Sequence, residues 1–171
     1  MMMRMLAHGG APILTDGRRP PDEDNPRGYF ELEAVKASGG DAAWAHHAVG
    51  RCVKVISFLL PHLPVTLDYR VVFMRRDIDQ VMRSQRAMLA RRGLAPTAED
   101  EPTARRSLAD HLAEIEAWLE RASHMRVLGV SYEAVLARPD AELSRILDFL
   151  RLDLDHAAMR NAIEPALQRQ R

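Results

Sequence analysis

Two arginines and a serine form the clearest candidate for a chemical site in this sequence. Arg75 and Arg76 follow a short apolar stretch at residues 69–74, and Ser84 lies eight positions after Arg76. A guanidinium offers a planar fork of donors and a hydroxyl adds one more, a combination that suits a phosphate. The alternative interpretation is that both arginines are solvated charges that end a strand.

The residues around this candidate predict a strand that runs directly into a helix. Residues 69–74 are β-branched and apolar enough for a fully buried strand. Asp77 is a favourable N-cap, and Gln80 completes an Asp version of the capping box. Because ligands collect at the carboxyl ends of strands in an open α/β sheet, we expect an anion to bind at this junction.

Strands alternate with helices along the remaining chain. This alternation predicts one α/β domain over residues 1–171, a three-layer α/β/α arrangement with a parallel sheet. Two further strands are predicted at residues 51–58 and 124–130. Helices are predicted at residues 1–7, 34–48 (weakly), 139–150 and 155–163, and another amphipathic helix is predicted to begin at Ser107.

Composition excludes several classes of protein. The 24 basic and 24 acidic side chains cancel, which argues against nucleic-acid binding, and no apolar run is long enough for a membrane span. A single cysteine, Cys52, excludes an internal disulfide and indicates a reducing compartment, so we expect a cytoplasmic protein. The histidines do not predict a metal site, because His111 and Glu114 share a helix face without a recognisable third ligand.

Two segments resemble sulfotransferases that use 3′-phosphoadenosine 5′-phosphosulfate (PAPS). Arg76 and Ser84 are similar to the 3′-phosphate-binding element of that family, and residues 127–152 (VLGVSYEAVLARPDAELSRILDFLRL) resemble its strand-Tyr-Glu-x-x-Leu-x-x-Pro-helix-Phe-Leu segment. The resemblance implies that Tyr132 lies against the adenine, for which an aromatic face is a suitable platform. The alternative is that Tyr132 caps the core. The implied fold is that of the P-loop kinases.

A third segment resembles the acceptor side of the same family. The loop DEDNPRGYFELEAVK at residues 22–36 is similar to one that carries a glutamate general base in the carbohydrate and tyrosylprotein branches. Glu31 is then the first candidate for the base that takes the acceptor's proton, and Glu33 the second. The phenol-type branch uses a histidine on the strand expected at residues 51–58, where this chain has none. His62, in the connector that follows, is a third candidate, and Glu31 fits a simple loop charge equally well.

Both ends of the sequence bear on the resemblance. The family's Gly/Ser-rich loop that cradles the 5′-phosphosulfate is absent, and residues 1–8 resemble the helix that follows it, so we expect a chain that lacks the first strand and this loop. Arg169 and Arg171 could reach the 3′-phosphate as basic C-terminal residues do in relatives, or could belong to a polar tail.

The resemblance implies a sulfotransferase that moves a sulfonate group from PAPS to a hydroxyl or amine. The polar loop before Glu33 favours a polar acceptor such as a sugar, a peptide or a small metabolite, and no metal is expected. Two alternatives stay open: a non-catalytic nucleotide-binding or interaction domain that retains the scaffold, and a relative of the P-loop nucleotide kinases.

Overall fold

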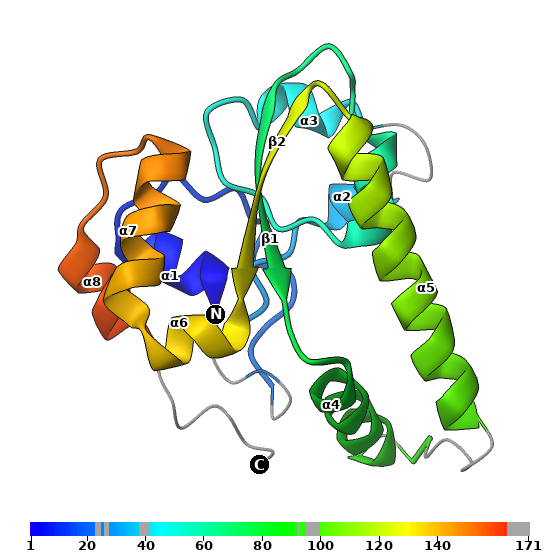
Figure 1. Ribbon diagram of the computed structural model, residues 1–171. Coiled ribbons are helices and arrows are strands. Elements are labelled where there is room, and N and C mark those ends of the chain that lie inside the picture. Colours follow the sequence, from blue (N-terminus) through cyan, green and yellow to red (C-terminus); the bar gives the residue numbers. More distant parts are fainter. Residues whose placement is uncertain (23–24, 26–27, 38–41, 92, 95–99, 164–171) are drawn as a thin grey trace.

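A pair of parallel strands forms the centre of the protein (Figure 1). The computed structural model describes residues 1–22, 25, 28–37, 42–91, 93–94 and 100–163. Strand β1 (Tyr69–Arg75) pairs with β2 (Met125–Ser131), from Tyr69 opposite Met125 to Arg75 opposite Ser131. The two strands therefore reach their carboxyl ends at the same level. The predicted α/β class with a parallel sheet is confirmed.

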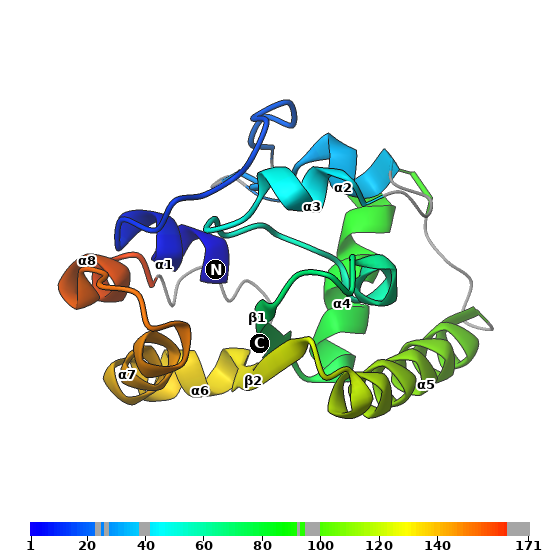
Figure 2. The same cartoon turned by 90° about the horizontal axis from the view of Figure 1, so that it is seen from above.

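Different helices cover the two faces of this sheet. Because side chains alternate along a strand, Val72 and Val130 join one apolar core while Phe73 and Met125 join another. Figures 1 and 2 show α1, α7 and α8 on one side of the strands and α5 on the other. The covering elements are α1 (Met2–His8), α6 (Tyr132–Ala137), α7 (Pro139–Leu150) and α8 (His156–Asn161) on the first face, and α5 (Asp100–Arg121) with the 3-10 helix η1 (Ser57–His62) on the second.

The helix after β1 begins where the sequence predicts it. Helix α4 (Ile78–Arg91) follows the strand at once, and the Asp77 carboxylate accepts a hydrogen bond of 2.9 Å from the Gln80 N–H. This bond satisfies one of the otherwise unpaired amides at a helix N-terminus. The short connection fixes the side chains of the junction to the end of the sheet.

The prediction of a strand at residues 51–58 is wrong. Cys52 forms only an isolated parallel bridge with Ile13, and η1 already begins at Ser57. A strand needs a neighbour for its backbone N–H and C=O groups, and beyond Cys52 none of the described residues provides a ladder. Ile56 and Phe58, whose apolar side chains suggested a buried strand, are 55% and 61% exposed.

The helices differ from expectation mainly in three parts of the chain. Helix α5 begins at Asp100 rather than Ser107, because acidic residues and a proline are favourable in a first helical turn. Two short helices, α2 (Glu33–Ala37) and α3 (Trp44–His47), replace the weak helix expected at residues 34–48. Helix α6 was not predicted; the Ser131 hydroxyl caps it by accepting a hydrogen bond of 3.2 Å from the Ala134 N–H.

Helix α1 packs so closely on α8 that a side chain at Gly9 would collide with it. An added Cβ would lie 2.5 Å from Cγ of Met159, which is fully buried. We expect Gly9→Ala to lower the free energy of unfolding by about 1–3 kcal/mol through overpacking, measured by urea denaturation. In a Met159→Ala background the methyl group has room, and the same change should cost much less. Equal costs in both backgrounds would contradict the assigned contact.

Candidate functional site

Arg76 and Tyr132 lie against each other at the carboxyl end of the sheet. Each is the first residue after its strand, and the pairing of Arg75 with Ser131 brings the two to the same level. The Arg76 guanidinium carbon is 4.8 Å from the centroid of the Tyr132 ring, a cation–π distance. Both side chains are half-buried. The structure thus brings together the residues predicted to hold a phosphate and a purine.

Glu133 links the two strand ends beside this pair. Its carboxylate accepts hydrogen bonds from the Ser131 hydroxyl at 2.8 Å and from the Asp77 N–H at 3.3 Å. Burial would raise the pKa of Glu133, but hydrogen bonds from its own backbone, Ser131 and Asp77, with the charge of Arg76, together lower it below 4.5. The carboxylate therefore holds the start of α4 against the start of α6.

The predicted capping box forms only in part. The Asp77 carboxylate caps the Gln80 N–H, but the Gln80 side chain does not return the bond to Asp77. Its Oε1 atom instead accepts a hydrogen bond of 3.3 Å from Nε of Arg76. In a complete capping box the Gln80 side chain would accept a hydrogen bond from the Asp77 N–H. Because that side chain faces Arg76 instead, the Asp77 N–H is available to Glu133.

Ser84 lies one helical turn beyond Gln80. Residues four apart share a helix face, so Ser84 is on the side of α4 that carries the contact with Arg76. Its side chain is half-buried. This position suits a second donor to a ligand held by Arg76, and the role of Ser84 stays a prediction.

Arg75 has a different role from its neighbour. Its Nε atom forms an ion pair of 2.8 Å with Glu116 of α5. To reach α5 the side chain crosses β2 at Gly129, where an added Cβ would lie 3.4 Å from the guanidinium carbon. Arg75 therefore connects the sheet to α5, and Arg76 is left as the arginine of the candidate site.

A second charged cluster surrounds Glu31. Its Oε1 atom lies 3.3 Å from Nζ of Lys54 and 3.5 Å from Nη1 of Arg19. Its backbone oxygen accepts a hydrogen bond of 2.8 Å from the Thr15 hydroxyl. The Arg19 guanidinium carbon lies 3.3 Å from the centroid of the Tyr29 ring. Glu31 thus anchors its loop through side chain and backbone, and its role as a base stays a prediction.

Two more of the predicted site residues, Glu33 and His62, lie at exposed positions. Glu33 is exposed in the first turn of α2, where its N–H donates a hydrogen bond of 2.6 Å to Asp16. That bond, a second one from the Arg18 backbone and the charge of Arg18 lower the pKa of the Asp16 carboxyl. His62 is exposed at the end of η1. Arg169 and Arg171 lie outside the described residues.

His111, which shares a helix face with Glu114, contacts residues of η1. Nε2 of His111 lies 2.8 Å from the Ser57 hydroxyl oxygen, and its ring stacks on Phe58 with centroids 3.5 Å apart. Among the described residues, no three His, Cys, Asp or Glu side chains gather into a possible metal site. None of the described helices is both long and apolar enough to cross a membrane.

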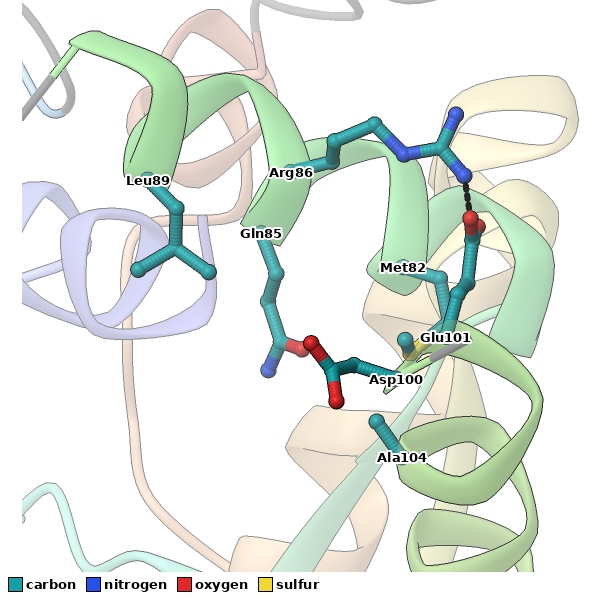
Figure 3. Close-up of a pocket in the computed structure, with 7 residues that line it drawn as sticks. All are labelled: Met82, Gln85, Arg86, Leu89, Asp100, Glu101 and Ala104. Carbon is teal, nitrogen blue, oxygen red and sulfur yellow. Dashed lines mark ion pairs between the residues drawn. The ribbon is translucent and has the colours of Figure 1, made fainter. Parts of the chain in front are cut away.

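A small pocket of about 80 Å³ lies between α4 and α5. Figure 3 shows Met82, Gln85 and Leu89 of α4 on one side of the pocket, Asp100 and Ala104 of α5 on the other, and an ion pair between Arg86 and Glu101. At 100° per residue, the α4 positions in this pocket lie on the side opposite Gln80 and Ser84. The pocket is therefore separate from the site at Arg76 and Tyr132.

The sequence did not predict Gln80 and Glu133 as parts of the site, or Lys54 and Arg19 as partners of Glu31. In the sequence, Gln80 belongs only to a capping motif and Glu133 only to the segment that resembles the family. Their contacts join the N-termini of α4 and α6, which are more than fifty residues apart. The signal that could have found them is the expectation that parallel strands end at one edge.

The sequence matches a protein family model described as the sulfotransferase family over residues 31–156. This range covers most of the chain and includes Glu31, Arg76, Ser84 and Tyr132. No curated protein and no solved structure matches the chain.

The hydrogen bonds to Glu133 predict an acid-sensitive contribution to stability. Because the pKa of Glu133 is lowered in the folded protein, its contribution is present above the unfolded value of 4.5 and is lost as pH falls through the folded value. We expect the difference in unfolding free energy between the wild type and Glu133→Gln to shrink as pH falls from neutral to well below 4.5, measured by urea denaturation. A difference independent of pH would contradict the assigned bonds.

Proposed function

This chain belongs to the sulfotransferase family, and on that premise we propose that it transfers a sulfonate group from PAPS to a hydroxyl or amine of a polar acceptor. The single observation that best supports this donor is the contact of Arg76 with Tyr132 at the carboxyl end of the sheet. PAPS carries a purine and a ribose 3′-phosphate, and an aromatic ring beside a guanidinium offers a partner for each.

In this proposal the nucleotide spans the start of α4. The adenine lies against Tyr132, the 3′-phosphate accepts hydrogen bonds from Arg76, and the Ser84 hydroxyl on the same side of the helix donates another. The positive charge of Arg76 attracts the negatively charged phosphate. The basic residues Arg169 and Arg171 would add to this charge if they reach the site.

Transfer itself needs a base on the acceptor side. A lone pair of the acceptor oxygen or nitrogen attacks sulfur, the bond from sulfur to the bridging phosphate oxygen breaks, and adenosine 3′,5′-bisphosphate leaves. Glu31 is our candidate for the group that takes the acceptor's proton. Lys54, 3.3 Å from Glu31, would place a positive charge near the reacting groups. Glu33 and His62 are exposed and are the second and third candidates.

A specific observation also favours the second candidate function, a nucleotide-binding domain without catalysis. The Glu31 carboxylate is already paired with Lys54 and Arg19, as expected of a residue that anchors a loop. A base that is engaged in two ion pairs must give them up, at least in part, to accept a proton. The two functions share the nucleotide site and differ in whether Glu31 acts in transfer.

Calorimetric titration of adenosine 3′,5′-bisphosphate tests the nucleotide site. We expect micromolar binding by the wild type and a loss of about tenfold or more in Arg76→Ala, because a hydrogen bond to a charged group contributes about 1.5–3 kcal/mol. Ser84→Ala should weaken binding by a smaller factor. Arg126→Ala, which removes the same charge near the amino end of β2, is the matched control. Absence of binding by folded wild-type protein would overturn the proposed function.

Transfer from labelled PAPS to a panel of sugars, peptides and amines tests the role of Glu31. Glu31→Gln retains the shape and an oxygen for Lys54 and Arg19, so we expect nucleotide affinity to be unchanged while transfer falls by about 100-fold or more. Glu120→Gln, at an exposed position of α5, is the control. Transfer that survives Glu31→Gln would exclude Glu31 as the base, and nucleotide binding without transfer in the wild type would favour the non-catalytic function.

A further inference from the structure

We propose that Gln80 and Glu133 are positioning residues that aim the Arg76 guanidinium at a ribose phosphate, and that they set the preference of this site for nucleotides with a 3′-phosphate. The inference rests on the proposed function and names residues that act through Arg76 rather than on the nucleotide itself. It follows from a closed set of contacts at the junction of β1 with α4 and β2 with α6.

The contacts form a ring that returns to its starting residue. From Arg76, Nε donates to Gln80 at 3.3 Å, and the Gln80 N–H donates to Asp77 at 2.9 Å. The Asp77 N–H donates to Glu133 at 3.3 Å. Glu133 follows Tyr132, whose ring lies 4.8 Å from the Arg76 guanidinium carbon. Movement of Arg76 away from Tyr132 would strain or break at least one of these contacts.

Glu133 makes the contribution of Gln80 possible. In an ordinary capping box the Gln80 side chain would accept a hydrogen bond from the Asp77 N–H. Here the Glu133 carboxylate takes that bond, and the oxygen of Gln80 is left for Arg76. Glu133 supplies an acceptor from the neighbouring strand, so the amide of Asp77 is satisfied without Gln80. The two residues therefore work as a pair.

The bond to Gln80 determines which donors of Arg76 face a ligand. A guanidinium has one N–H at Nε and four on its two terminal nitrogens. Gln80 engages Nε, and within the described part of the chain no hydrogen bond or ion pair involves the terminal nitrogens of Arg76. Two parallel bonds from an arginine to phosphate give geometric specificity as well as energy. A fixed guanidinium also loses less rotational freedom when the phosphate binds.

The neutral side chain of Gln80 matters as much as its position. An amide oxygen orients Arg76 without cancelling its charge, whereas a carboxylate at position 80 would form an ion pair and compete with the phosphate. Glu133, which follows Tyr132 in the chain, already accepts hydrogen bonds from Ser131 and Asp77. The arrangement therefore leaves the charge of Arg76 to attract an anion.

The test compares the affinities of adenosine 3′,5′-bisphosphate and adenosine 5′-monophosphate by calorimetry. Gln80→Met keeps the length of the side chain and removes the acceptor, and we expect it to reduce the preference for the 3′-phosphate about fivefold with little change for the monophosphate. Glu133→Gln should reduce the preference for the 3′-phosphate by a smaller factor, because one acceptor oxygen remains at position 133. Gln80→Glu should weaken binding of the bisphosphate by competition for Arg76.

Gln85→Met, on the pocket side of α4, is the matched control and should leave both affinities unchanged.

The Arg76→Ala background separates a positioning role from a general loss of structure. If Gln80 acts through Arg76, Gln80→Met should have no further effect on the preference in that background. An unchanged preference in Gln80→Met with Arg76 present would overturn the inference and leave the proposed function standing. Failure of the wild type to prefer the 3′-phosphorylated nucleotide would overturn the proposed function and the inference together.

Discussion

The candidate site depends on the in-register parallel pairing of β1 with β2. Because Arg75 is opposite Ser131, the chain leaves both strands at one level, and α4 and α6 begin almost at once. The carboxylate of Glu133 can then reach the backbone of Asp77. A shift of one residue in this register would turn the side chains of a strand to the opposite face and separate these partners. The geometry of the site is thus a property of the sheet and not of a long loop.

Arg75 and Arg76 have different roles at the carboxyl end of the sheet. Arg75 crosses β2 at Gly129 and pairs with Glu116, so its charge is matched by an acid and it joins two layers of the fold. Arg76 faces an amide oxygen and an aromatic ring, neither of which cancels its charge. Sequence alone gives both residues the same chemistry. Their partners, which come from distant segments, distinguish the arginine that supports the fold from the one that suits an anion.

Local patterns predicted the local features of the structure. The strand before Arg76 and the Asp77 cap are confirmed, because composition and a favourable N-cap act over a few neighbouring residues. The expected strand at residues 51–58 is wrong, because a strand depends on a partner that its own sequence does not reveal. The same limit applies at the site: Arg76 was recognisable beside its strand, whereas the contact of Glu133 with Asp77 depends on strand pairing.

The close packing of α1 on α8 has a consequence for how the domain folds. Gly9 contacts Met159, and the Gly9 oxygen accepts a hydrogen bond of 3.0 Å from the Asp155 N–H. These partners are about 150 residues apart, so the chain must close a very large loop before α1 can bury its apolar side. Contacts of such separation slow folding and form late. Until then the methionines of α1 that are buried in the folded domain, Met2 and Met5, remain open to solvent, where chaperones and proteases can reach them.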